Sequence, residues 1–123
     1  MPRPRAVISG LGFVTCLGHD RTAVATSLRE LRSGIERHEF FPGADLPVKV
    51  AGTLKGFDTA SPQWPAWRWP EGYTFPRDLL RGMAPHGLYA LCATERLIED
   101  AGLTKADLAS DDTALFCASA GSP

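Results

Sequence analysis

The clearest pattern in the first part of the chain is an apolar run that ends in a glycine-rich turn. It spans residues 6–18 and contains Gly10, Gly12 and Gly18. A short apolar run that ends in glycine predicts a buried strand. Glycine takes a positive φ without a Cβ clash, which suits a tight turn. We therefore expect a strand and then a tight turn, with any chemistry near that turn.

A helix is predicted directly after this turn. Asp20 can accept hydrogen bonds from the free amides of a helix that starts near Arg21. Gly34 is expected to end the helix in a left-handed conformation. Apolar positions at i, i+4 and i+7 form one face that should pack on a sheet. They are Val24, Leu28 and Leu31.

The pattern becomes irregular over residues 35–45, which predicts a loop. A strand is predicted over residues 47–52, because Val48 and Val50 share one side and Lys49 points to the other.

Residues 61–76 hold all three tryptophans and four prolines. Proline at this density leaves few amide donors for a helix or a sheet, so we expect a loop. Its tryptophans could form an exposed binding surface beside Arg68. We favour the alternative that they pack as the loop's own small core. They are Trp64, Trp67 and Trp69.

The last third of the chain predicts a helix and then a strand. Pro85 suits the first turn of a largely buried helix, and Gly102 supplies its end. Residues 113–118 are an unbroken apolar run that predicts a central strand covered on both faces. The order of strand, helix, strand, helices and strand is that of an α/β domain with a mixed or parallel sheet.

Composition is that of one soluble globular domain. The 123 residues are 44% hydrophobic and 22% charged, with a formal net charge of −1. Basic residues are dispersed, so no nucleic-acid surface is predicted. No apolar run approaches the roughly 18 residues of a membrane-spanning helix, and no signal peptide is recognised. We expect a cytoplasmic protein.

Three cysteines without a Cys-x-x-Cys pair suggest neither a disulfide framework nor a zinc site. Cys92 lies within the predicted helix between apolar residues, where it should act as a small filler. Cys16 lies three residues from His19, a possible base, but we favour a structural role for this thiol as well.

Other polar residues carry no assigned chemistry. His19, His38 and His86 lack metal-ligand spacing and are expected to face solvent or cap elements. An acidic group should form the solvated side of the long helix, with Arg96 paired to Asp100 at i, i+4. That group is Glu95, Glu99 and Asp100.

The glycine turn also invites comparison with the dinucleotide fingerprint Gly-x-Gly-x-x-Gly. Thr15 replaces the third glycine, and the helix begins only near Arg21, too late to meet a phosphate held by the turn. Glu30 falls inside the helix, whereas the fingerprint needs an acidic residue at the end of a second strand. These departures make the match weak, and a small nucleotide-binding α/β protein is kept as the least favoured alternative.

The same chain resembles the opening of the β-ketoacyl synthases, the condensing enzymes of fatty acid and polyketide synthesis. The resemblance starts with Gly10-Leu11-Gly12-Phe13-Val14-Thr15 and Leu17-Gly18, where Cys16 replaces the proline usual in the family. It continues in order through four further segments and fades between residues 59 and 75. These are residues 27–35, 46–52 with Phe57-Asp58, Arg81-Gly82-Met83 and Glu99-Asp100-Ala101-Gly102-Leu103.

The resemblance implies an incomplete amino-terminal half of a thiolase-like layered α/β/α fold, in which residues 1–123 form a partial domain. The family's nucleophilic cysteine and two histidines lie further along a longer polypeptide, so we expect an amino-terminal fragment or a truncated relative. Cys117 falls where the family has a non-catalytic strand. Ser119, one residue away from a Gly-x-Ser-x-Gly elbow, lacks the helix, acid and histidine that such an elbow needs.

We therefore assign no catalytic, cofactor-binding or metal-binding residue to this chain and expect no cofactor. The complete form would be a 3-oxoacyl-[acyl-carrier-protein] synthase, an acyltransferase that acts on acyl thioesters and acyl carrier protein. It would be a homodimer or a heterodimer with another synthase, whereas the 123 residues alone would be inactive. An alternative is a non-catalytic, chain-length-factor-like partner of a complete synthase.

Overall fold

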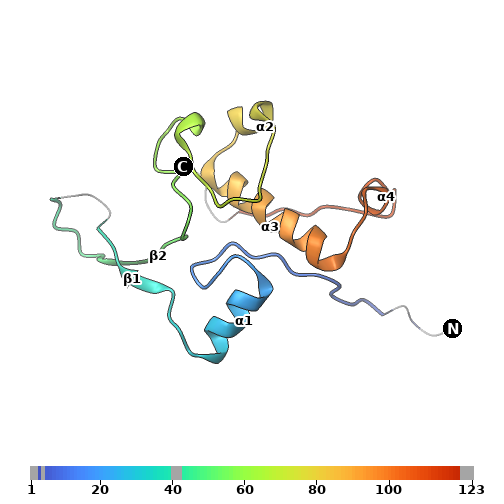
Figure 1. The fold of residues 1–123 in the computed structure, drawn as a ribbon, viewed down its shortest axis with the longest axis horizontal. Helices are drawn as coiled ribbons and strands as arrows, with labels where there is room; N and C mark the ends of the chain where they lie inside the picture. Colours follow the sequence, from blue (N-terminus) through green and yellow to red (C-terminus); the bar gives the residue numbers. More distant parts are fainter. Residues whose placement is uncertain (1–2, 4, 40–42, 120–123) are drawn as a thin grey trace.

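The computed structural model describes residue 3, residues 5–39 and residues 43–119. The long helix α3 lies at the centre, with α1 on one side and α2 on the other (Figure 1). The elements are α1 (Arg21–Arg29), β1 (Ile35–Arg37), β2 (Val50–Gly52), the 3₁₀ helix η1 (Trp64–Ala66), α2 (Arg77–Arg81), α3 (Pro85–Ala101) and α4 (Lys105–Leu108). Helix and strand content is mixed, consistent with a segment of an α/β fold.

Helix α1 begins where the sequence predicts. The side chain of Asp20 accepts a hydrogen bond from the amide of Ala23 at 2.8 Å, which satisfies one of the free donors of the first turn. Val24 is buried as expected, but Leu28 and Leu31 are exposed, so the predicted apolar face is covered only at its start.

The end of α1 differs from the prediction. The helix stops at Arg29, and the residue in the left-handed conformation is Leu31, with φ 53°, rather than Gly34. Gly34 serves close packing: a Cβ at this position would lie 2.9 Å from Cβ of Cys16. The glycine is therefore needed for an approach between two segments and not for a helix end.

Helix α3 matches its predicted bounds. Pro85 occupies the first turn, and Gly102 ends the helix with a left-handed φ of 65°. Leu88 and Cys92 are fully buried. The rest of the helix is half-buried or exposed, so α3 is less covered than expected.

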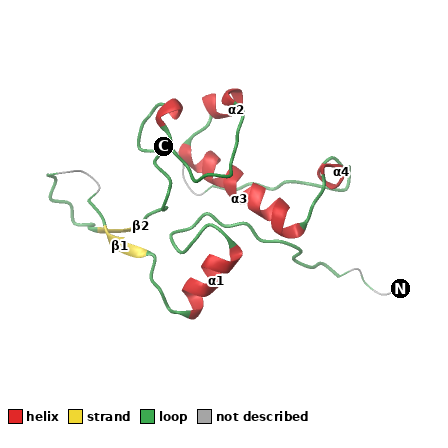
Figure 2. Ribbon diagram, viewed as in Figure 1, coloured by secondary structure: helices red, strands yellow, loops and turns green. Residues whose placement is uncertain are grey.

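The described sheet is a two-stranded antiparallel ladder and not the expected mixed or parallel sheet (Figure 2). Strand β1 falls in the predicted loop, and β2 forms the end of the strand predicted over residues 47–52. The paired residues are Ile35 with Gly52, Glu36 with Ala51, and Arg37 with Val50.

Two predicted strands are not formed in the described structure: the one expected before the glycine turn in residues 6–18, and the one expected over residues 113–118. Within the described ranges neither segment has a ladder partner, apart from an isolated bridge between Thr15 and Gly18. A strand exists only when its backbone pairs with another, so an apolar pattern alone does not make one. Val7, Ile8 and Phe116 are exposed, and Phe116 is 92% exposed, whereas Phe13 and Val14 are half-buried.

The core lies between the Trp-rich loop, α2 and α3. Trp67 is buried, and its indole N–H donates to the carbonyl of Ser61 at 2.7 Å. The indole of Trp69 donates to the carbonyl of Tyr73 at 3.2 Å. These contacts agree with the packing role favoured for the loop. The buried cluster is Trp67, Tyr73, Leu80, Leu88 and Cys92.

Two short helices, α2 and α4, were not anticipated. Helix α4 starts with a capping box, in which the hydroxyl of Thr104 accepts from the amide of Asp107 and the Asp107 carboxylate accepts from the amide of Thr104. The hydroxyl of Thr113 donates to the carbonyl of Asp107 at 2.6 Å, which ties the following segment to α4.

Among the described helices, none has the length and apolar character needed to cross a membrane.

Candidate functional site

The glycine turn at residues 15–18 is closed by its own hydrogen bonds. The amides of Thr15 and Gly18 each donate to the other's carbonyl, at 3.1 and 3.2 Å. The hydroxyl of Thr15 donates to the same Gly18 carbonyl at 3.0 Å and accepts from the amide of Leu17 at 3.1 Å. Because the hydroxyl of Ser27 donates to the carbonyl of Leu17 at 2.9 Å, the turn is also fixed to α1.

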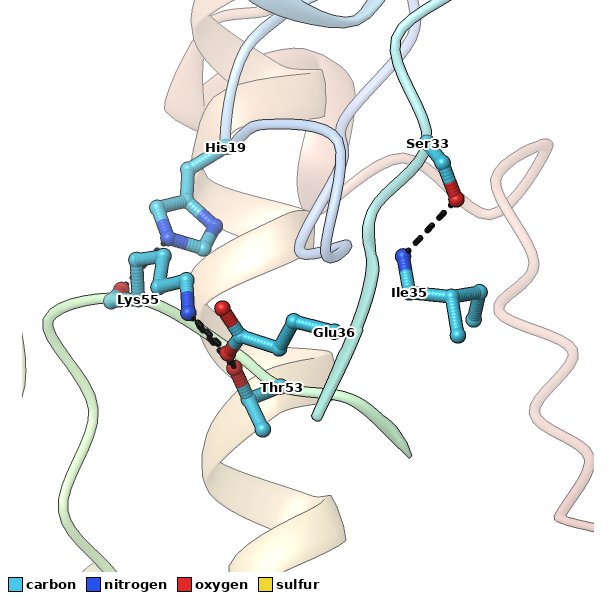
Figure 3. A network of polar contacts seen from close by, with 6 residues as sticks. All are labelled: His19, Ser33, Ile35, Glu36, Thr53 and Lys55. Atoms are coloured by element: carbon cyan, nitrogen blue, oxygen red, sulfur yellow. Dashed lines mark hydrogen bonds and ion pairs between the residues drawn. The ribbon is translucent and has the colours of Figure 1, made fainter. Parts of the chain in front are cut away.

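His19 leaves this turn and reaches the loop after β2 (Figure 3). Its Nε2 lies 2.7 Å from the carbonyl oxygen of Lys55, and its ring packs edge-on against Phe57. The carbonyl can only accept, so Nε2 carries the proton, and the buried Nδ1 has no hydrogen-bond partner among the described residues. His19 is therefore a packed link between two segments, which corrects the expectation of a solvent-facing or capping side chain.

Next to His19, a carboxylate joins β1 to the same loop (Figure 3). Glu36 accepts hydrogen bonds from Lys55 Nζ and Thr53 Oγ1, and Lys55 Nζ also donates to Thr53 Oγ1 at 2.8 Å. These bonds, followed by the positive charge of Lys55, lower the pKa of Glu36 below its ordinary value of 4.5. Glu36, Thr53 and Lys55 therefore form one group of mutual hydrogen bonds.

Asp100 ties the glycine segment to the end of α3. Its carboxylate accepts from the amide of Leu11 at 3.0 Å and pairs with Arg21 at 3.4 Å. The predicted partner, Arg96, pairs instead with Glu99 at 2.7 Å. Asp100 is thus a structural anchor and not part of a solvated face.

A signal for this role was present in the sequence. A carboxylate in the last turn of a helix opposes the helix dipole, so Asp100 needs a compensating donor.

Arg96 makes a second contact besides its ion pair with Glu99. It donates from Nε to the hydroxyl of Tyr73 at 3.1 Å and lies over its ring. The bond to Tyr73 and then the bond to Glu99 raise the pKa of Arg96, which remains charged.

The glycines before the turn lie against the backbone of α3. A Cβ at Gly10 would lie 2.6 Å from Cβ of Ala101, and one at Gly12 would meet the carbonyl oxygen of Ala93 and lie 2.7 Å from the amide nitrogen of Leu97. Neither glycine has a positive φ; of the three, Gly18 has one, at 152°. Gly10 and Gly12 therefore serve close approach rather than the turn conformation.

The three thiols lie in different surroundings. The Cys16 side chain packs between Gly34 and Gly52. Cys92 lies fully buried in the core, and this burial raises the pKa of its thiol to about 11, which leaves it neutral and unreactive at physiological pH. Cys117 is exposed in the segment after α4. Burial therefore excludes Cys92 as a nucleophile.

The remaining candidates form no site together. The side chains of His38 and His86 are exposed, as is Ser119, and the segment after Ser119 that would complete an elbow lies outside the described residues. Over the described ranges, no three His, Cys, Asp or Glu side chains are arranged to hold a metal ion. The arrangement around residues 10–19 is therefore a packed junction of α1, α3 and the β1–β2 ladder.

Comparison with known protein families gives a match over almost the whole chain. The profile for the β-ketoacyl synthase N-terminal domain matches residues 4–122. No solved structure matches significantly.

Curated relatives agree with this profile. The chloroplastic 3-oxoacyl-[acyl-carrier-protein] synthase II of Arabidopsis thaliana is 32% identical over 108 residues, which cover 88% of this chain and 18% of the relative. The 3-oxoacyl-[acyl-carrier-protein] synthase 1 of Escherichia coli is 34% identical over 100 residues, 81% of this chain and 21% of the relative. A putative polyketide β-ketoacyl synthase 2 of Streptomyces cyaneus is 30% identical over 107 residues, 87% of this chain and 23% of the relative. The chain thus spans about a fifth of these proteins.

Proposed function

The chain belongs to the β-ketoacyl synthase N-terminal domain family, and from this premise we propose that it supplies the amino-terminal part of a 3-oxoacyl-[acyl-carrier-protein] synthase. Such an enzyme holds an acyl group as a thioester on cysteine and condenses it with a malonyl unit on acyl carrier protein, with loss of carbon dioxide. The proposal rests on the match over residues 4–122.

Within that enzyme, residues 1–123 act as a partial domain of a thiolase-like layered fold and supply scaffold rather than the nucleophile. The surroundings of the thiols support this division, because Cys16 is wedged between glycines and Cys92 is held neutral in the core. Acyl carrier protein and acyl thioesters are the partners of the complete enzyme, which works as a homodimer or as a heterodimer with another synthase.

The packing of the glycine segment supports a condensing-enzyme scaffold over a dinucleotide-binding protein. In a dinucleotide site, backbone amides of the glycine turn approach a pyrophosphate. Here the space that a ligand would need at Gly12 is filled by the backbone of α3, at Ala93 and Leu97.

The direct test replaces the matched 100 residues of the Escherichia coli synthase with the residues of this chain that align with them. We expect the chimera to condense an acyl thioester with malonyl-acyl carrier protein, measured as release of labelled carbon dioxide. The free 123-residue chain, assayed beside it, should show no acyl transfer. A soluble chimera without condensation, or acyl transfer by the free chain, would refute the proposal.

A further inference from the structure

We propose that His19 is a proton-sensitive link, whose neutral ring holds the glycine turn to the loop after β2 and whose protonation releases that loop. Imidazole is the side chain that ordinarily changes its charge between pH 5 and 8. His19 gives one ring nitrogen to a hydrogen bond, and its other nitrogen, Nδ1, is buried without a partner among the described residues. When the ring becomes charged, Nδ1 is the atom that has to take the proton.

The link joins three parts of the fold. Nε2–H of His19 donates to the carbonyl of Lys55 at 2.7 Å, and the ring meets Phe57 edge-on with 5.2 Å between the ring centroids. Phe57 in turn packs edge-on against Tyr89 of α3, at 5.3 Å between centroids. The hydroxyl of Tyr89 is hydrogen-bonded to that of Thr59. The ring of His19 therefore connects the glycine turn, through the loop, to α3.

Protonation changes what the ring needs from its surroundings. The neutral ring donates from Nε2 and has a lone pair at Nδ1, whereas the charged ring carries a second N–H at Nδ1. That N–H would be buried with no acceptor in the described chain, and a charged group placed in this way costs free energy. Turning the ring out to solvent removes the cost, but the turn gives up both the Lys55 carbonyl and the packing on Phe57.

The charged groups around the ring do not relieve this cost. The loop contributes Lys55, whose ammonium carries the same charge that the ring would gain (Figure 3). The Glu36 carboxylate of β1 is bonded to that ammonium, and Asp20, next in the chain, caps α1. The nearest titratable group on α3 is the phenol of Tyr89, which lies beyond Phe57. The link should therefore hold above the titration range of histidine and weaken as the pH falls through it.

The release should be local, because the buried core is built from other side chains, among them Trp67, Leu88 and Cys92. Proteins open in local units without unfolding as a whole. The loop ends in a backbone bridge, in which the amide of Asp58 donates to the carbonyl of Arg68 at 2.9 Å. The Asp58 amide is therefore a reporter for the loop, and the Cys92 amide within α3 is a reporter for the core.

Nuclear magnetic resonance of the free chain tests the proposal, and it does not involve the condensation reaction. At pH 7.5 the ring proton should lie on Nε2, with a nuclear Overhauser contact between His19 and Phe57. At pH 5.5 that contact should be lost. Hydrogen exchange at the Asp58 amide, corrected for the intrinsic effect of pH, should become at least about fivefold faster, while exchange at Cys92 stays unchanged.

His19→Gln tests the role of the proton, with His86→Gln as its matched control. Glutamine keeps an N–H donor for the Lys55 carbonyl and has no titratable nitrogen. The exchange of Asp58 should therefore remain slow at both pH values in His19→Gln. His86 is exposed in the first turn of α3, so His86→Gln should respond to pH as the wild-type chain does.

Several outcomes would overturn the proposal. They are a ring proton on Nδ1 at pH 7.5, a contact with Phe57 that persists unchanged at pH 5.5, and a pH response that survives in His19→Gln or disappears in His86→Gln. The wild-type chain alone provides a further check that needs no variant. The ring signals of His19 and the exchange of Asp58 must change over the same pH range, and a change over different ranges would show that the ring does not control the loop.

Discussion

Leu31 adopts a backbone conformation that favours glycine, and its side chain is almost fully exposed. The left-handed region costs an L-residue about 1–2 kcal/mol. The position closes the end of α1, where the amide of Arg32 donates to the carbonyl of Ser27 at 2.9 Å. This geometry is common at helix ends, where glycine is the usual occupant.

Leu31→Gly is therefore expected to stabilise the chain by about 0.5–1 kcal/mol, the relieved strain less the entropy that glycine loses on folding. The measurement is the midpoint of urea unfolding. Leu28→Gly, one turn earlier and inside the helix, is the matched control and should destabilise by about 1 kcal/mol. Loss of stability in Leu31→Gly would show that the side chain makes a contact that outweighs the strain.

Gly12 shows the opposite case, a glycine whose missing side chain is needed. Gly12→Ala would push a Cβ into the backbone of α3 at Ala93 and Leu97. We expect a loss of about 2–3 kcal/mol in the free energy of unfolding, since α3 cannot move without disturbing the core.

Gly82→Ala is the control for that substitution, because a Cβ at Gly82 meets nothing within 4 Å and its φ of −104° suits alanine. It should be neutral or stabilise by about 0.4–1 kcal/mol. Equal effects of the two substitutions in thermal and urea unfolding would mean that the approach of residues 10–12 to α3 is not specific.

At the scale of elements, the β1–β2 ladder is held to its following loop by Glu36. The carboxyl has a lowered pKa in the folded chain, so its contribution to stability is present above the unfolded value near 4.5 and is lost as the pH falls through the folded pKa. The group is exposed, so the effect is modest and screened by salt.

Glu36→Gln should therefore flatten the acid side of the curve of unfolding free energy against pH and leave the shape above pH 6 unchanged. Glu71→Gln, a carboxylate change in the exposed part of the Trp-rich loop, controls for net charge. A wild-type acid slope retained in Glu36→Gln would place the titrating group elsewhere.

Helices could be predicted from the sequence because their signals are local. Asp20 caps α1, and Pro85 and Gly102 mark the two ends of α3. Strands depend on partners that the pattern does not name. Strand β1 was missed because its ladder to β2 is what defines it, and residues 113–118 have the pattern of a strand without a partner in the described chain.

The same division applies to the residues around the glycine turn. The interior position of Cys92 follows from helical spacing, which is local. The contacts of His19 with the carbonyl of Lys55 and of Asp100 with the amide of Leu11 span 36 and 89 residues. Such contacts follow from the tertiary arrangement, so the sequence predicts the segments but not the bonds between them.

At the scale of the whole molecule, the accessible surface of 9991 Å² exceeds the about 6,500 Å² expected of a folded monomer of 13.3 kDa, and this surplus has a consequence for unfolding. The slope of the unfolding free energy against denaturant concentration is proportional to the surface that unfolding exposes. With 9991 Å² already exposed in the folded chain, that slope should be about a quarter to a third smaller than for an ordinary domain of 123 residues.

Urea unfolding followed by tryptophan fluorescence measures this slope, because Trp67 is buried in the core. A slope of ordinary size for the free chain would contradict the exposure of residues 6–8 and 113–119.

The hydrogen bond from the Thr113 hydroxyl to the carbonyl of Asp107 attaches the start of the exposed segment 113–119 to α4. Ordering one residue costs about 1–2 kcal/mol of backbone conformational entropy, and at Thr113 this bond offsets part of that cost. The capping box of α4 holds Asp107 in place, so it also determines where residues 113–119 leave the helix.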